Sequence, residues 1–160
     1  MRKRKVIMKI ILSRKGFDSG NEGYSPILPD GTLLSFPIPD EMSGLKYSDI
    51  HYNGKSLLEI WKSLKLKKNN FPEYCHLDPD IRANLRELKE WKPAFGQCDK
   101  AQCHLSKCEV QKGDIFLFFG SFRRTEEHTG SIRYIPGTRP MHVIYGYLQI
   151  GEILSDYKLI

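Results

Sequence analysis

Four polar residues, Arg14, Lys15, Asp18 and Ser19, follow directly on a β-branched segment that is typical of a buried strand. Such a strand would hold the start of the loop in place. An arginine guanidinium can grip a phosphate or carboxylate with two hydrogen bonds, and glycine amides of the loop can approach the same anion. Asp18 and Ser19 can bind a sugar hydroxyl or a base edge. The spacing matches no phosphate-binding fingerprint, so a solvated turn explains these residues as well.

A second polar group comprises His76, Asp78 and Asp80. An imidazole and two carboxylates this close in sequence can form an acid–base pair or part of a metal site. The same residues also suit a helix start, with Asp78 as N-cap, Pro79 at the first position and Asp80 near the positive end of the helix dipole. Capping is the simpler explanation for the aspartates, whereas the role of His76 stays open.

Amide and imidazole side chains form a third group, at Gln97, Gln102 and His104. Gln97 can read a base edge because its amide both donates and accepts hydrogen bonds. Gln102 and His104 lie on different faces if their segment is helical, so at most one of them shares a site with Gln97. A buried, hydrogen-bonded histidine explains His104 equally well.

Two further candidates lie at the ends of predicted strands. Arg123 follows the apolar run at 115–119, and His142 opens a later strand. Polar groups at strand ends are often where a scaffold presents a site. Asp114, just before the apolar run, is better explained by a turn.

The chain has four cysteines, Cys75, Cys98, Cys103 and Cys108. Without an export signal we expect a cytoplasmic protein in a reducing compartment, and therefore no disulfide framework. The last three cysteines and His104 could together bind zinc, but their spacing is at the long end for zinc and the segment is typical of a helix. We expect no metal site, and the sequence does not identify a cofactor.

Hydrophobic periodicity and turn signals predict the elements that position these residues. Strands are expected at 6–12, 33–38, 115–119 and 141–154, the last being bent or divided. Helices are expected at 56–67, 79–91 and 101–105, and a long polar excursion at 120–137. Strands and helices do not alternate regularly, which argues against a doubly wound sheet. We predict an α+β fold with a mixed, mainly antiparallel sheet and two or three helices.

Length and composition favour one ordinary globular unit. The 160 residues carry a net charge of +6, and no apolar run approaches the roughly 20 residues of a bilayer-spanning helix. Residues 1–8 are predicted to be a basic extension and residues 9–160 a single domain. The positive charge favours an anionic partner such as a nucleotide or nucleic acid, and no membrane partner is expected.

Several segments, taken in order, resemble a known family. They lie at 9–19, 37–40, 76–80, 95–97, 113–120 and 145–151. Together they resemble the nucleotide modification-associated domain 3 family, found in bacteria and phages, over nearly the whole chain. The resemblance implies a role in DNA base hypermodification, together with other DNA-modification proteins. It leaves the cysteines out of the pattern, and it implies a shortened C-terminus, since family members continue past the last strand.

Two hypotheses follow. The first is an enzyme, or enzyme subunit, that acts on a nucleotide or DNA base. Its predicted catalytic residues are Asp18, His76 and Asp78. Its predicted substrate- or phosphate-binding residues are Arg14, Lys15, Ser19, Asp40, Gln97, His104 and Arg123. The alternative is a non-catalytic module that recognises a modified base, whose binding to DNA would weaken as salt rises.

Overall fold

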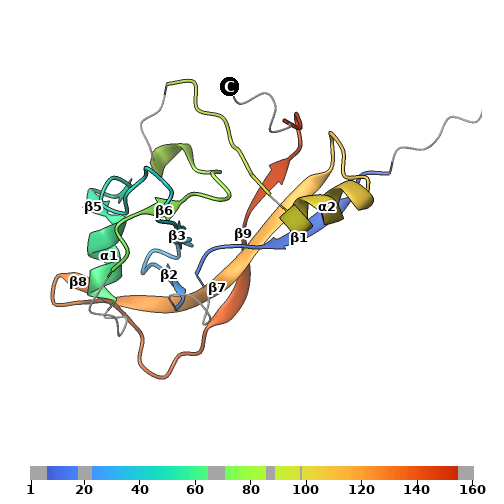
Figure 1. Ribbon diagram of the computed structural model, residues 1–160. Coiled ribbons are helices and arrows are strands. Elements are labelled where there is room, and N and C mark those ends of the chain that lie inside the picture. The colour runs from blue at the N-terminus through green and yellow to red at the C-terminus, as the bar shows by residue number, and fades with distance from the viewer. Residues whose placement is uncertain (1–6, 18–22, 65–70, 86–88, 98, 155–160) are drawn as a thin grey trace, which may run out of the picture.

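A computed structural model describes residues 7–17, 23–64, 71–85, 89–97 and 99–154 (Figure 1). The strands are β1 (Ile10–Arg14), β2 (Ser25–Ile27), β3 (Ile38–Pro39), β4 (His51–Tyr52), β5 (Lys55–Ser56), β6 (Cys75–His76), β7 (Ile115–His128), β8 (Ser131–Tyr134) and β9 (Met141–Gln149). The helices are α1 (Leu57–Ser63), the single-turn 3₁₀ helix η1 (Ala83–Leu85) and α2 (Asp99–Lys107). The predicted α+β class is confirmed. No helix in the described ranges is long and apolar enough to cross a membrane.

Strand β7 is the axis of the main sheet. β1 and β2 pair with it in parallel, whereas β8 and β9 pair with it antiparallel, so the sheet is mixed. β1 and β9 both pair with the same apolar stretch of β7, and they therefore flank it on opposite sides. The small sheets β3–β6 and β4–β5 are antiparallel.

The chain leaves the main sheet between β1 and β2. The Lys15 N–H still donates to the Phe119 carbonyl oxygen at 2.9 Å, and β2 rejoins β7 at Phe122. Gly120 lies opposite this exit, where a Cβ would stand 2.7 Å from the Lys15 carbonyl oxygen. A glycine is needed here because any side chain would push the departing backbone away. The break in the sheet thus fixes where the loop beginning at Lys15 starts.

Two hydrophobic clusters flank this break. The larger surrounds Trp61 of α1, whose ring centroid lies 4.9 Å from those of Phe17 and Tyr47. The smaller lies between α2 and the sheet and contains Phe116 and Phe118. Lys15 stands in the chain between Ile11, which packs on the smaller cluster, and Phe17 of the larger one. The polar start of the loop therefore has a core on either side.

Helix α1 forms where its periodicity predicts. Ser56 caps it by accepting the Glu59 N–H, and the Glu59 carboxylate accepts the Ser56 N–H in return. Its buried residues, Leu57, Ile60 and Trp61, face the larger cluster. The predicted helix ran to residue 67, and its end beyond residue 64 lies outside the described residues. The predicted helix at 101–105 is confirmed as α2.

The helix predicted at 79–91 is wrong within the described residues, which form only the single turn η1 there. Asp80 instead pairs with Ala94 through two backbone hydrogen bonds of 2.9 Å each. The Asp78 carboxylate binds Lys15 and the Gly96 N–H and is not a helix cap. Partners distant in sequence thus override a local helix-start pattern.

The polar excursion predicted at 120–137 is also wrong. β7 runs on to His128 and turns at Thr129 and Gly130 into β8. Its second half pairs with β2 on one edge and β8 on the other, and the Thr125 hydroxyl donates to the Ile27 carbonyl at 2.7 Å.

The strand predicted at 33–38 is largely absent, because Leu33 forms only an isolated bridge and β3 begins at Ile38. Between them, the Phe36 N–H donates to the Ser25 hydroxyl at 3.0 Å, outside any ladder. The first and last predicted strands are confirmed in part, as β1 and β9. The start of the first one, up to residue 6, lies outside the described residues.

Candidate functional site

A lysine–aspartate ion pair lies at the break in the sheet. Lys15 Nζ is 2.7 Å from Asp78 Oδ2, and the two side chains are 17% and 13% exposed. Asp78 Oδ1 accepts the Gly96 N–H at 3.1 Å, so both carboxylate oxygens have partners. Lys15 Nζ also lies 4.7 Å from the centre of the Phe95 ring. The ammonium and the carboxylate are therefore held in one geometry and largely withdrawn from water.

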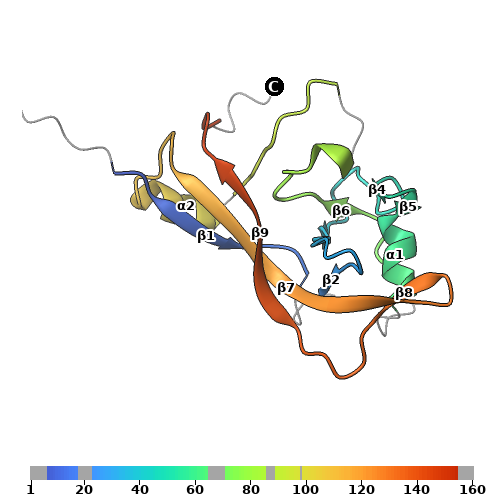
Figure 2. The same cartoon turned by 180° about the vertical axis from the view of Figure 1, so that it is seen from behind.

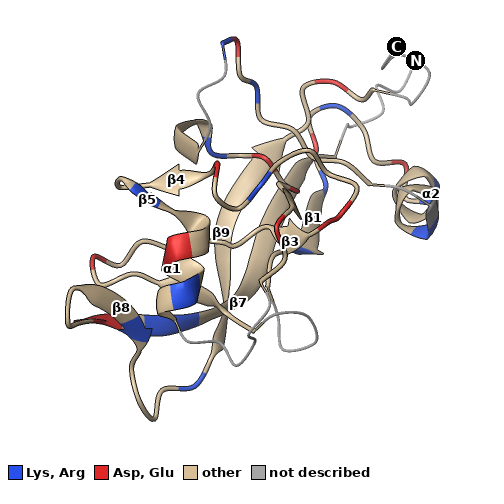
Figure 3. Cartoon of the chain, turned by 60° about the vertical axis from the view of Figure 1, so that its left-hand side comes forward, with Lys and Arg blue, Asp and Glu red and all other residues tan. Residues whose placement is uncertain are grey.

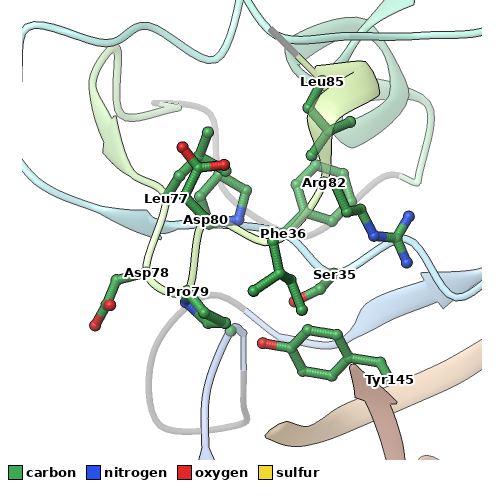
Figure 4. A pocket seen from close by; sticks show the side chains of 12 residues that line it. Ser35, Phe36, Leu77, Asp78, Pro79, Asp80, Arg82, Leu85 and Tyr145 are labelled. Carbon is green, nitrogen blue, oxygen red and sulfur yellow. The ribbon is translucent and has the colours of Figure 1, made fainter. Parts of the chain in front are cut away.

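A small cavity of about 20 Å³ adjoins the pair. Figure 4 shows Asp78 at one end of its lining and Arg82 at the other, with Ser35 and Tyr145 between them. A water molecule needs at least about 10–15 Å³, so the cavity has room for a single water. The cavity is too small for a substrate, and we assign to it a supporting role behind the ion pair.

Burial controls the ionisation of the groups around this cavity. It raises the pKa of Tyr145 to about 12, and the negative charge of Asp78 adds to the rise, whereas a hydrogen bond with Ser35 and the charge of Arg82 oppose it. Burial also lowers the pKa of the Arg82 guanidinium, which donates to the Leu33 carbonyl. Arginine stays charged in proteins even so. At neutral pH Tyr145 is therefore a protonated hydrogen-bond donor beside a cation.

Close backbone approach brings these segments together. Gly146 of β9 faces Ile81, and a Cβ at Gly146 would lie 2.2 Å from Ile81 Cδ1. The segment carrying Asp78 can consequently lie directly against β9. This contact also places Tyr145 beside the cavity.

A larger groove of about 200 Å³ lies between β1 and α2. Its lining is Ile11, Leu12, Ser13, Phe95, Gln97, Ala101, His104, Leu105 and Phe116. Most of these side chains are apolar, and the polar ones are Ser13, Gln97 and His104. His104 Nε2 is 3.6 Å from the Cys108 sulfur. Phe95 belongs to both regions, since its ring lines the groove and contacts Lys15.

The structure thus joins four of the predicted residues in two adjacent places. Lys15 and Asp78 form the ion pair, while Gln97 and His104 share the groove. Gln102 is exposed and does not line the groove, in keeping with the expectation that only one of the two α2 side chains accompanies Gln97.

His76 and Asp40 form a separate pair. His76 Nδ1 lies 3.3 Å from Asp40 Oδ2, where β3 pairs with β6, and the side chains are 52% and 32% exposed. Neither residue lines the cavity or the groove. Asp40 can orient the imidazole, but the structure does not bring His76 to the ion pair.

Arg14 and Arg123 are not at this site. Arg14 is an exposed residue of β1 and does not line the groove. Arg123 stacks on Tyr134 at 5.1 Å and binds Thr138 Oγ1 and the Ile135 carbonyl at 3.2 Å each. Its guanidinium secures the loop between β8 and β9. Asp18 and Ser19 lie outside the described residues.

Sequence reasoning missed Ser35, Arg82 and Tyr145. Tyr145 had a usable signal, because a glycine inside a strand pattern, here Gly146, marks a close backbone approach. Ser35 and Arg82 carry no local signal, since only their contacts across the cavity reveal them.

In the part of the chain that the structure describes, the other charged side chains and thiols form no second centre. Figure 3 shows Lys and Arg interspersed with Asp and Glu over the described chain, so its positive charge is not gathered in one stripe. Cys103 and Cys108, both exposed, are free thiols. Within the described ranges, no three His, Cys, Asp or Glu side chains are grouped closely enough to hold a metal ion.

No curated protein and no solved structure matches the chain. The family model described as nucleotide modification associated domain 3 matches residues 9–159, which is nearly the whole chain and includes every residue of the ion pair and the groove. The chain therefore belongs to the nucleotide modification associated domain 3 family.

Proposed function

We propose that this protein binds a nucleotide, free or within DNA, in the groove between β1 and α2, and that Lys15 and Asp78 take part in modifying it. The family description supports a nucleotide-related role. The observation that carries the proposal is the position of Phe95, whose ring lines the groove on one side and contacts the largely buried Lys15 on the other.

The groove suits a nucleobase. Its apolar lining offers Phe95 and Phe116 to a planar ring, and aromatic side chains commonly stack on bases. The Gln97 amide can donate to and accept from a base edge, and His104 offers a second polar contact. Ligand sites usually measure about 300–1,000 Å³. At about 200 Å³ the groove fits the base alone, with the sugar and phosphate outside it.

The ion pair suits proton and phosphate chemistry. A phosphate approaching past Phe95 would compete with Asp78 for the Lys15 ammonium, which is a compact point charge able to bind either. Asp78 would then keep the Gly96 N–H as its partner and stay oriented. A carboxylate released from its cation in a site this dry is placed to accept a proton from the substrate. His76, oriented by Asp40, would act only on a part of the substrate that reaches beyond the groove.

The reader hypothesis uses the same groove without the chemistry. In that case the wild type shows no turnover, and Asp78→Asn, which retains an oxygen for the Gly96 N–H, leaves nucleotide binding intact. In the enzymatic case the same variant retains nucleotide binding but loses turnover.

The first test is thermal stabilisation by deoxynucleoside monophosphates, free bases and short single-stranded DNA. A ligand at a hundred times its dissociation constant adds about 2.7 kcal/mol of stability. For a chain of this size that raises the midpoint by roughly 5–11 °C. We expect a monophosphate or oligonucleotide to stabilise the wild type, Gln97→Leu to reduce the shift, and Lys15→Met to reduce it only for phosphate-bearing ligands.

Lys46→Met is the matched control. Lys46 Nζ lies 2.6 Å from Glu73 Oε1 and 5.3 Å from the Tyr74 ring centre, so it has the same kinds of contact as Lys15, yet it lies outside the cavity and the groove. Its loss should leave the ligand-induced shift unchanged. The proposal fails if no nucleotide stabilises the wild type, or if Gln97→Leu and Lys15→Met respond as Lys46→Met does.

A further inference from the structure

One face of the main sheet exposes a continuous set of apolar side chains. Ile10 and Leu12 of β1 are 62% and 65% exposed, and Ile144 and Tyr147 of β9 are 54% and 71% exposed. The strand register places these side chains beside Leu117 and its neighbours on β7. We name this surface the open face, and it consists of Ile10, Leu12, Ile115, Leu117, Phe119, Ile144 and Tyr147. In Figure 2, α2 lies behind β1, and no described helix lies in front of β1, β7 and β9.

The open face is unusual because the other side of the same strands already packs against α2 and lines the groove. Ile11 and Ser13 of β1 are half-buried and line the groove beside α2, whereas Ile10 and Leu12 alternate with them and are exposed, Leu12 also bordering the groove. A sheet that is covered on one side normally presents polar residues to water on the other. Contiguous exposed apolar surface of this kind marks an interaction site.

The size of the open face fits a protein interface. An aromatic side chain such as that of Tyr147 buries roughly 200 Å² and the smaller Ile and Leu side chains bury less, so the four most exposed ones present on the order of 400 Å². The half-buried Ile115, Leu117 and Phe119 and a polar rim add to this. The total approaches the roughly 800 Å² that each partner contributes to a standard stable interface.

The charges around the open face favour a second copy of the chain. Where β1, β7 and β9 pair, Arg14 and His142 are the basic side chains described on this side, and both lie at the Phe119 end. Single-stranded nucleic acid needs cations along its whole track, and the rest of the face has none. Gln149 lies at the opposite end, paired with Ile115.

A two-fold axis near Leu117 is compatible with this distribution of polar residues at the two ends of the open face. It would place the apolar centre of one copy on that of the other and bring Arg14 over Gln149 of the second copy. The like charges of the two copies would then lie at opposite ends of the contact. Two sheets packed face to face in this way stand about 10 Å apart, with their side chains interdigitating.

We propose that the open face is the interface of a homodimer formed by face-to-face packing of two main sheets. Apart from Leu12, the residues that line the groove lie outside the open face, so both nucleotide sites of the dimer stay open to solvent. The homodimer does not depend on the proposed function, and either can fail without the other.

Sedimentation equilibrium of the full chain, from low to high micromolar concentration, tests the homodimer. We expect a reversible monomer–dimer equilibrium. Leu12→Lys and Tyr147→Lys should each weaken it at least roughly thirtyfold, the loss typical of a central interface residue. Both side chains are exposed in the monomer, and circular dichroism checks that each variant folds. Met42→Lys is the matched control, because Met42 is 94% exposed and lies off the main sheet.

A wild type that stays monomeric over the whole range overturns the homodimer, as does a dimer that survives both lysine substitutions. A monomer that binds a single-stranded oligonucleotide, and loses that binding in Tyr147→Lys, also overturns it and makes the open face a nucleic-acid surface.

Discussion

The Lys15–Asp78 pair should be strongly coupled, and this can be measured without knowing the substrate. Replacing Lys15 by Met removes the ammonium and keeps much of the stem that packs on Phe95. Replacing Asp78 by Asn removes the charge and keeps an oxygen for the Gly96 N–H. Each single variant leaves one charge without its partner in a site where the side chains are only 17% and 13% exposed.

The expected magnitude follows from that burial. Breaking a fully buried pair by removing one partner costs about 3–5 kcal/mol. The residual exposure lets water reach the pair, so we expect about 2–3 kcal/mol for each single variant, equivalent to a midpoint lower by roughly 4–12 °C. The double variant leaves no orphaned charge and should cost less than the two singles together, giving a coupling energy of about 2 kcal/mol.

Urea unfolding followed by the fluorescence of buried Trp61 measures the four free energies of the cycle. The coupling should persist at high salt, because mobile ions screen buried pairs weakly. Lys46 and Glu73 form the matched cycle, with a similar separation of 2.6 Å but side chains 39% and 60% exposed, and their coupling should be too small to resolve. A Lys15–Asp78 coupling within about 0.5 kcal/mol of zero would refute the desolvated site.

Two further expectations concern the frame of the site. Gly120→Ala should lower the free energy of unfolding by about 1–3 kcal/mol, because the added Cβ would lie 2.7 Å from the Lys15 carbonyl oxygen. The control in the same urea titration is Gly44→Ala, whose added Cβ would have no atom within 4 Å. Equal stability of the two variants would contradict this. Stability should also fall as the pH rises from 10 towards about 12, because Tyr145 ionises at its ordinary pKa of 10.0 when unfolded but at about 12 when folded. Tyr145→Phe should make the fall shallower, and an unchanged slope would count against the burial of its hydroxyl.

Elements encoded by local patterns were predictable. The apolar run of β7, the periodicity of α1 and the start of β9 each depend on neighbours in sequence. The helix predicted at 79–91 failed because its start signal rested on Asp78, whose actual partner Lys15 is 63 residues away. The second half of β7 was missed because it forms a strand only through its pairing with β2 and β8, which are distant or not evident in the local pattern.

The amino-acid sequence by itself determined the α+β class, the family and the presence of Lys15, Asp78, Gln97 and His104. Only the tertiary structure decided which of them meet. Adjacent strand residues point to opposite faces, so Arg14 and Lys15, neighbours in sequence, do not share a site. The ion pair, the groove and the open face all arise from contacts between segments far apart in the chain, and a pattern read along the sequence carries no information about such distances.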